Sequence, residues 1–246
     1  QSDHLYLVQA GSAGRRYERI LPKDIGRYHK FPSRAAAPAP EYPAITKGEL
    51  AEAAKALPEG LYALVSRVQD LYLLNAARPT KAMLLLDRRS AAKMREEEKE
   101  LPFKRDSLVL WLDPFMPQGD EDWLSEEIEY WSARGQRFWV ANTPAHLGML
   151  RGRDATVIAG PYLYAFNAWA ATFLLGEGAR FIVPPYEISK QDFQRVSEFV
   201  PPAAWMPIVF AYPALFRLRA DLTRKYDYRF FSDRDGRYYE LASDDE

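Results

Sequence analysis

Residues 107–142, SLVLWLDPFMPQGDEDWLSEEIEYWSARGQRFWVAN, contain two apolar runs separated by an amphipathic segment. The runs 107–113 and 137–142 are continuously apolar rather than alternating, which is typical of strands buried on both faces of a parallel sheet. Between them, residues 120–135 place apolar side chains at helical spacing and end at Gly135, a residue type that commonly follows a helix C-terminus. This stretch therefore predicts one strand–helix–strand unit of a parallel α/β sheet.

The same alternation of apolar run and helical pattern continues on both sides of this unit. Parallel strands joined by right-handed helical crossovers form either an open doubly wound sheet or a barrel. No glycine-rich phosphate loop follows the first run, and roughly seven strands are expected, which favours a parallel (β/α) barrel-like fold of TIM type, complete or incomplete. The remaining apolar runs are 61–67, 82–87, 155–160, 180–183 and 206–212.

Changes in composition divide the chain into three expected parts. Residues 1–45 contain one short apolar run, 4–10, and a proline- and alanine-rich segment, 31–45, which predicts a semi-extended linker or a strap over a surface. Residues 46–225 are expected to form the barrel-like domain. Residues 226–246 begin with an alternating stretch around Asp-Arg-Asp-Gly, which predicts a C-terminal β-hairpin followed by an acidic tail.

Composition also excludes several classes of protein and site. The 246 residues include 33 Lys and Arg against 34 Asp and Glu, a balance that does not indicate a nucleic-acid or membrane surface. No apolar run approaches the ~18 residues of a membrane-spanning helix, and no leader is recognisable, so the expected location is the cytoplasm. The absence of cysteine excludes disulfides and thiolate nucleophiles, and three scattered histidines without an HExxH motif do not predict a histidine metal site.

Polar side chains are expected at the carboxyl ends of the parallel strands, where chemistry gathers in such sheets. Asp87, Asp113 and Asn142 each fit a helix cap or turn as well as a site. Glu187 follows two prolines and has no standard capping role, so site residue and surface ion-pair partner stay equally open for it. The full expected set is Arg67, Asp87, Asp113, Asn142, the loop 160–167, Glu187 and Tyr212.

One strand-to-helix loop is unusually aromatic, with Tyr162, Tyr164, Phe166 and Asn167 within six residues. In the structural interpretation, the aromatic rings fill the barrel mouth and Asn167 caps the next helix. In the functional interpretation, the rings form a platform on which another ring or a base stacks. We expect this loop to line a polar cleft that it shares with Glu187.

Four short motifs follow one another along the chain. Residues 160–167 read GPYLYAFN, residues 184–189 read PPYEIS, residues 212–221 read YPALFRLRAD, and residues 233–236 read DRDG. In order and spacing they resemble the collagenase-like peptidase family U 32, whose patterns are G-x-Y…L-N-x-[FW]-N, S-P-E-L-S, G-R-x-P-L-M-x-x-R-x-C and D-R-x-G. The positions in register include Glu187, Leu215, Phe216, Arg219, Asp233, Arg234 and Gly236.

The resemblance implies a barrel-like α/β fold and leaves two functions open. Family members are described as peptidases of unassigned mechanism, so one expectation is hydrolysis of a peptide or protein substrate by the rim carboxylates Glu187 and Asp113. The alternative is a non-catalytic barrel that binds RNA, a peptide or a partner chain, which includes another domain of a longer chain, in a family linked to oxygen-independent hydroxylation of RNA or quinone precursors. The side chains expected to contact the substrate or partner are Tyr162, Tyr164, Phe166, Asn167 and Arg219.

The chain departs from the family pattern at two positions. Asp221 stands where a family cysteine is expected, and Tyr164 replaces the first asparagine of the aromatic motif. Because the chain has no cysteine, we expect no iron–sulfur cluster. The predicted cofactor is therefore none, with a divalent metal between rim carboxylates as the open alternative.

Overall fold

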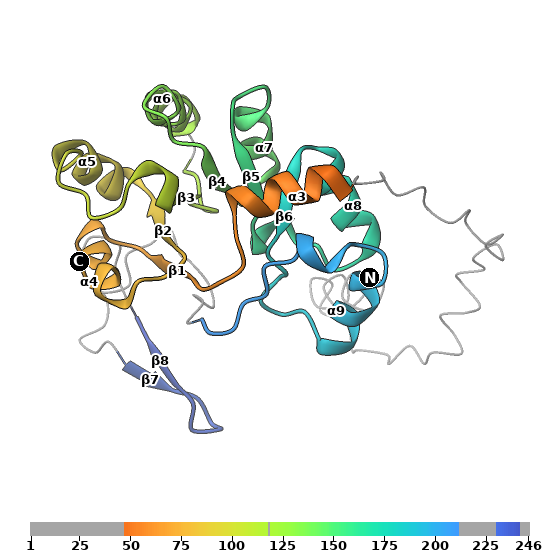
Figure 1. The fold of residues 1–246 in the computed structure, drawn as a ribbon. Coiled ribbons are helices and arrows are strands. Elements are labelled where there is room, and N and C mark those ends of the chain that lie inside the picture. The colour runs from red at the N-terminus through yellow and green to blue at the C-terminus, as the bar shows by residue number, and fades with distance from the viewer. Residues whose placement is uncertain (1–46, 118, 212–229, 242–246) are drawn as a thin grey trace, which may run out of the picture. The chain divides into compact units, whose positions relative to one another are not determined.

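The structure, a computed structural model, describes residues 47–117, 119–211 and 230–241. These residues contain a six-stranded sheet in which every neighbouring pair is parallel, and a separate two-stranded hairpin. The strand order in the sheet is the order along the chain, β1 to β6 (Figure 1). The predicted parallel α/β architecture is thereby confirmed, whereas closure of the sheet into a barrel is not shown.

Strands and helices alternate along the sheet-forming part of the chain. The strands are β1 Tyr62–Val65, β2 Lys81–Leu86, β3 Leu108–Leu112, β4 Phe138–Ala141, β5 Thr156–Ala159 and β6 Ala179–Ile182. The α-helices are α3 Lys47–Ala56, α4 Val68–Ala77, α5 Arg88–Glu96, α6 Glu121–Ser132, α7 Pro144–Leu150, α8 Ala168–Gly176 and α9 Lys190–Ser197. The short 3-10 helices are η1 Arg105–Ser107, η2 Pro161–Leu163 and η3 Pro202–Ala204.

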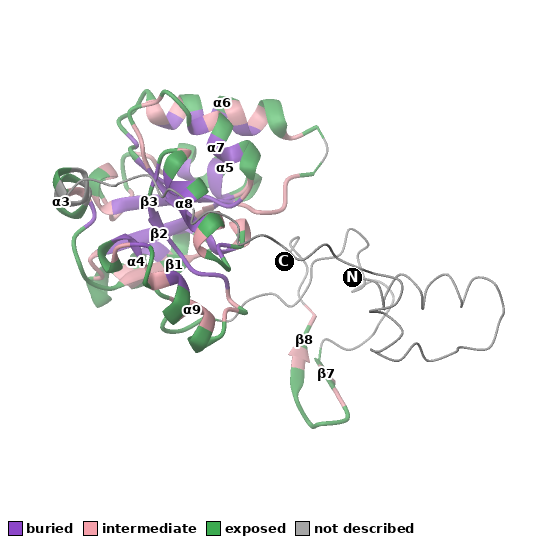
Figure 2. Ribbon diagram, turned by 90° about the vertical axis from the view of Figure 1, so that its right-hand side faces the viewer, coloured by how far each residue is buried: buried purple, intermediate pink, exposed green. Residues whose placement is uncertain are grey.

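The strands are apolar on both faces because different elements cover the two faces. In β3, Leu110 and Leu112 pack into a core cluster that includes side chains from each of the helices α4 to α9. Val109 and Trp111 pack into a second cluster on the opposite face, together with Leu57, the residue that follows α3. Figure 2 shows the strands buried between these layers, while the outward turns of the helices are exposed.

This arrangement positions the carboxyl ends of all six strands along one rim. The strand order does not reverse anywhere in the described sheet, so the sheet lacks the crossover that defines a doubly wound fold. Successive strand–helix units packed on the same face are the arrangement from which (β/α) barrels are built. Residues that follow β1 to β6 are therefore neighbours in space in the order in which they occur in the sequence.

The prediction of a strand at 206–212 is wrong for residues 206–211, the part of this run that the structure describes. Trp205 forms a single parallel bridge to Ile182, and the Met206 N–H donates to the Ile182 carbonyl at 2.9 Å, but no strand follows. The next bond of a parallel ladder would run from the N–H of residue 184 to the Met206 carbonyl, and Pro184 has no N–H to donate, which explains why pairing stops there. Tyr212 lies outside the described residues.

The hairpin predicted within 226–242 is confirmed. Strands β7 Phe230–Ser232 and β8 Tyr238–Glu240 pair antiparallel. The carboxylate of Asp233 accepts from the N–H groups of Asp235 and Arg237, both at 2.9 Å, and so closes the turn between the strands.

Several other expectations fall outside the described residues. They are the apolar run 4–10, the segment 31–45, the contact residue Arg219 and the tail beyond residue 241. Within the described ranges, no helix combines the length and the apolarity that crossing a membrane requires.

Candidate functional site

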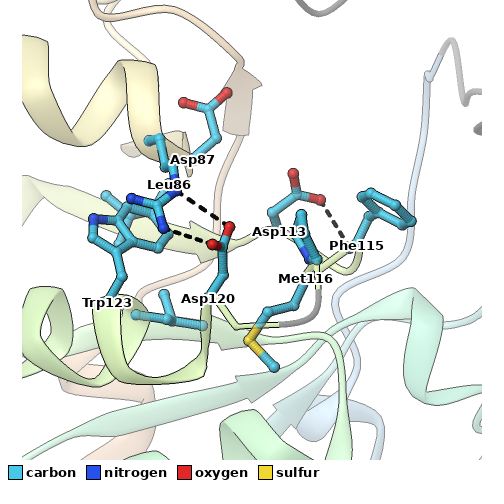
Figure 3. Close-up of a pocket in the computed structure, with 10 residues that line it drawn as sticks. Leu86, Asp87, Asp113, Phe115, Met116, Asp120 and Trp123 are labelled. Atoms are coloured by element: carbon cyan, nitrogen blue, oxygen red, sulfur yellow. Dashed lines mark hydrogen bonds and ion pairs between the residues drawn. The ribbon is translucent and has the colours of Figure 1, made fainter. Parts of the chain in front are cut away.

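The carboxyl ends of β2 and β3 and the first turns of α5 and α6 enclose a cavity of about 190 Å³. Pockets that hold drug-sized ligands have volumes of roughly 300–1,000 Å³, so this cavity has room for a single side chain or a small polar molecule. Figure 3 shows Asp87 beside Leu86, Asp120 beside Trp123, and Asp113 beside Phe115 and Met116. The lining residues are Leu86, Asp87, Arg88, Asp113, Phe115, Met116, Pro117, Asp120, Trp123 and Leu124.

Asp87, the residue after β2, is fixed at this cavity by capping α5. Its Oδ1 accepts from the Ser90 N–H at 2.7 Å, and the Asp87 N–H in turn donates to the Ser90 hydroxyl at 2.9 Å. This reciprocal capping box explains why an aspartate stands at a strand-to-helix junction. The capping interpretation is confirmed, and the same half-buried carboxylate also lines the cavity.

Asp113 directly follows β3 and lines the opposite wall of the cavity. Its Oδ1 accepts from the Phe115 N–H at 3.0 Å, an Asx turn that redirects the chain directly after the strand. The turn brings the side chains of Phe115 and Met116 onto the cavity (Figure 3). One of the two predicted catalytic carboxylates therefore lies in a cavity at the rim.

Helix α6 closes the cavity through an ion pair that sequence reasoning missed. The Arg88 guanidinium donates to Asp120 through Nη2 at 2.5 Å and through Nε at 3.3 Å, and it lies 4.7 Å from the centre of the Trp123 ring. Hydrogen bonding to Arg88 lowers the pKa of the Asp120 carboxyl below its usual value. Both side chains are therefore ionised, and their opposite charges cancel within the pair. The lining carries three carboxylates and one guanidinium, so carboxylates are in excess.

Glu187, the other predicted catalytic carboxylate, is not brought to this cavity. It is exposed, it follows β6, and strands β4 and β5 lie between β6 and β3 in the sheet. Glu187 is not among the described residues that line the cavity at Asp113. No group of three or more His, Asp or Glu within the described ranges is placed to hold a metal ion.

A second hollow, of about 530 Å³, lies beyond β6. It is mostly apolar, and its lining includes Ala211, the last residue of the described range 119–211. Glu187 does not line this hollow either, although its neighbours in the sequence do. The lining residues are Pro184, Pro185, Tyr186, Ile188, Ser189, Lys190, Phe193, Pro207, Ile208, Val209, Phe210 and Ala211.

Asn142 and His146 form a buried structural pair at the end of β4. The Asn142 side chain donates from Nδ2 to the Leu112 carbonyl at 2.7 Å, and its N–H donates to Nδ1 of His146 at 3.1 Å. Burial lowers the pKa of His146 to about 4, which keeps the imidazole neutral at pH 7. Both side chains are almost fully enclosed, and their hydrogen bonds join the end of β4 to the end of β3 and to α7.

The aromatic loop separates into a packed residue and an exposed pair. Tyr162 packs against the second core cluster and meets Tyr186 edge to face, with ring centres 5.7 Å apart. Tyr164 and Phe166 instead stack with an interplanar angle of 10° and a ring separation of 6.0 Å, and both are exposed. Ala165 between them is buried and anchors the turn. Tyr162 is therefore a partly buried residue that packs against the core, while the other two rings are exposed.

Asn167 acts as the N-cap of α8. Its Oδ1 accepts from the Ala170 N–H at 2.9 Å, the bond that the structural interpretation requires. Two further aromatic residues of α8, Trp169 and Phe173, are exposed next to the stacked pair in sequence, and sequence reasoning missed both. Their four-residue spacing in a helix without charged residues was the available signal.

No family model matches this chain, and no curated protein matches it. The resemblance to the U 32 peptidase family therefore stays a prediction.

Proposed function

We propose that this chain is a peptide-binding module whose rim cavity receives a Lys or Arg side chain of an extended peptide. The observation that carries the proposal is that the Asp87 and Asp113 carboxylates line one cavity together with the apolar side chains of Phe115 and Met116. Long cationic side chains bury their aliphatic stems against apolar surface and present their heads to carboxylates. The cavity offers both kinds of contact within a volume suited to one such side chain.

The charge of the lining supports a cation rather than an anion. Arg88 is engaged by Asp120 and by the Trp123 ring, so its charge is matched within the lining, whose other charged residues are Asp87 and Asp113. Two unit charges 4 Å apart interact by about 1 kcal/mol in water and by about 4 kcal/mol near a protein surface. Carboxylates at the mouth of a half-buried cavity therefore favour a cationic guest by an amount that binding measurements detect.

Hydrolysis by the rim carboxylates is the competing proposal. General acid–base catalysis requires both groups to lie within hydrogen-bond reach of the protons they transfer. Strands β4 and β5 lie between β3, which Asp113 follows, and β6, which precedes Glu187. This separation supports binding without cleavage.

Fluorescence anisotropy with matched peptides tests the proposal. The full chain is titrated against labelled ten-residue peptides in a Gly/Ser background that carry one central Lys, Arg or Gln. We expect the Lys and Arg peptides to bind at least tenfold more tightly than the Gln peptide. Asp113→Asn, which keeps an oxygen to accept from the Phe115 N–H, should weaken Lys binding about tenfold, which corresponds to ~1.4 kcal/mol.

Glu187→Gln is the matched control, and it should leave binding unchanged. Equal affinity for the Lys and Gln peptides, or unchanged Lys binding by Asp113→Asn, would overturn the proposal. Mass spectrometry of the recovered peptides separates the two functions. Cleavage that Glu187→Gln abolishes would establish the peptidase instead.

A further inference from the structure

The rim cavity already contains a cation that belongs to the chain itself. The Arg88 guanidinium donates to Asp120 through two nitrogens, at 2.5 and 3.3 Å, and its Cζ lies 4.7 Å from the centre of the Trp123 ring. Figure 3 shows Asp120 and Trp123 beside each other. A carboxylate next to the face of an indole ring is suited to hold a cationic head group. We call this pair of side chains the Asp120–Trp123 subsite.

The start of helix α5 does not explain an arginine at position 88. Arg88 is the first residue of α5, where the positive end of the helix dipole disfavours a positive charge. The helix is already capped by Asp87 and Ser90. Asp120, in contrast, is the N-cap residue of α6, where the dipole favours a negative charge. The contact with the Asp120–Trp123 subsite therefore accounts for Arg88 better than its place in α5 does.

Arg88 covers this subsite without being part of the wall behind it. The Arg88 side chain is 58% exposed and that of Asp120 is 18% exposed. Ion pairs with such an exposed partner contribute little to stability. The Trp123 ring packs against the main core cluster, so it stays in place when Arg88 moves away. Arg88 is thus a removable cover on a fixed subsite.

A cationic guest competes with Arg88 for the lining of the cavity. Asp87 and Asp113 line the same cavity as Arg88, Asp120 and Trp123. A lysine ammonium has three N–H donors, which carboxylates accept without the help of a ring. A trimethyllysine head has no N–H donor and depends on an aromatic face, which Arg88 already occupies. Arg88 therefore disfavours the trimethylated head more than the unmodified one.

We propose that Arg88 is an internal competitor that closes the Asp120–Trp123 subsite to trimethyllysine, while the rest of the cavity admits unmodified lysine. This inference rests on the proposed binding of cationic side chains at the rim. It adds to that function a discrimination between methylation states of the guest, and it assigns the discrimination to one residue.

Fluorescence anisotropy with the full chain tests the proposal. The labelled Lys and Gln peptides are joined by one that carries a central trimethyllysine in the same Gly/Ser background. We expect the wild type to bind the Lys peptide about fivefold more tightly than the trimethyllysine peptide. Arg88→Ala uncovers the Asp120–Trp123 subsite and should bind the trimethyllysine peptide about tenfold more tightly than the wild type does. Its gain for the Lys peptide should be smaller.

Lys93→Ala is the matched control. It also removes one positive charge from α5, but Lys93 pairs with Glu96 and Glu97 at 2.9 Å and does not line the cavity. Its affinity for both peptides should stay within about twofold of the wild-type value. An equal gain in both variants would overturn the proposal, because net charge would then set the affinity. A trimethyllysine affinity that Arg88→Ala leaves unchanged would also overturn it.

Asp120→Asn keeps the proposal testable if Arg88→Ala folds poorly. Asparagine is also a favourable N-cap, and this variant leaves Arg88 in the cavity without its carboxylate partner. It should bind the Lys peptide about threefold more weakly than the wild type, because the lining has lost a negative charge. Tighter binding of either cationic peptide by Asp120→Asn would contradict the competitor role of Arg88.

The same titrations separate this inference from the proposed function. If the wild type prefers Lys to Gln and Arg88→Ala gains no trimethyllysine affinity, the inference fails and the proposed function stands. If the wild type shows no such preference and Arg88→Ala acquires trimethyllysine binding, the proposed function fails and the competitor role stands. If neither protein distinguishes a cationic peptide from the Gln peptide, both fail.

Discussion

The side-chain oxygen of Asn142 occupies the space that a side chain on Gly160 would need. A Cβ added to Gly160 would lie 1.9 Å from that oxygen and 2.9 Å from Cγ1 of Val140. The two residues follow the neighbouring strands β4 and β5, and the Gly160 N–H donates to the Ala141 carbonyl at 2.7 Å. Because Asn142 also reaches the Leu112 carbonyl at 2.7 Å, the carboxyl ends of β3, β4 and β5 are joined beside the candidate cavity.

Gly160→Ala should destabilise the protein by roughly 2–4 kcal/mol, because the added methyl group must displace a buried hydrogen-bonded amide. Gly148→Ala is the matched control, since Gly148 lies in α7 and an added Cβ meets no atom within 4 Å. That control should be neutral or should stabilise by up to about 1 kcal/mol. Urea unfolding measures both changes, and a Gly160→Ala midpoint equal to that of wild type would contradict the close approach.

His146 should make the protein less stable as the pH falls below about 6.5. The imidazole has a pKa of about 4 in the folded chain because it is buried, against about 6.5 when unfolded. Above pH 6.5 both states are neutral and stability is complete. Between pH 6.5 and 4 only the unfolded state takes up the proton, so up to about 3 kcal/mol is lost.

His146→Gln, which keeps an acceptor for the Asn142 N–H, isolates this effect. Its free energy of unfolding should fall less than that of wild type between pH 7.5 and pH 4.5 in urea titrations. Parallel losses in the two proteins would show that another group titrates.

Asn167→Ala should cost about 1 kcal/mol of stability, because it removes the acceptor for the Ala170 N–H at the start of α8. Asn167→Ser keeps a capping oxygen and should retain most of that stability. Thermal unfolding measures both. If Asn167 contacts the ligand, as the family resemblance implies, then Asn167→Ser will weaken peptide binding in the anisotropy assay while it preserves the cap.

Asp87→Ser separates the two roles of the residue that caps α5. Serine is also a favourable N-cap, so stability should change by less than about 0.5 kcal/mol. The loss of the carboxylate should nevertheless weaken binding of the Lys peptide about fivefold, an effect that added salt diminishes because it screens charges. Full affinity in this variant would remove Asp87 from the binding site.

Much of the fold followed from the sequence because strands buried on both faces leave a strong signal. The run 107–113 became β3 with its bounds one residue shorter at each end. Thr143 and Ser189 are the N-caps of α7 and α9, and each accepts from an N–H three residues further on. Closure of a barrel depends instead on pairing at the edges of the sheet, which local pattern does not specify.

The candidate site was only partly predictable. The sequence shows which residues follow the strands, but it does not show which of these side chains line the same cavity. Asp113 was expected at the end of a strand and lies there, but its pairing with Glu187 assumed neighbours that the sheet order separates. The Arg88–Asp120 pair joins residues 32 positions apart, which no local motif records. Trp169 and Phe173 escaped notice because an uncharged helix ordinarily indicates complete burial.

Methionine methyl NMR tests the central claim most directly. The chain has five methionines, and Met116 lines the cavity that is proposed to receive the cationic side chain. Addition of the Lys peptide to the methyl-labelled chain should shift the Met116 signal and leave the other four in place, and the Gln peptide should shift none. A peptide that binds while Met116 stays unmoved, or that shifts Met206 beside the second hollow instead, would contradict the claim.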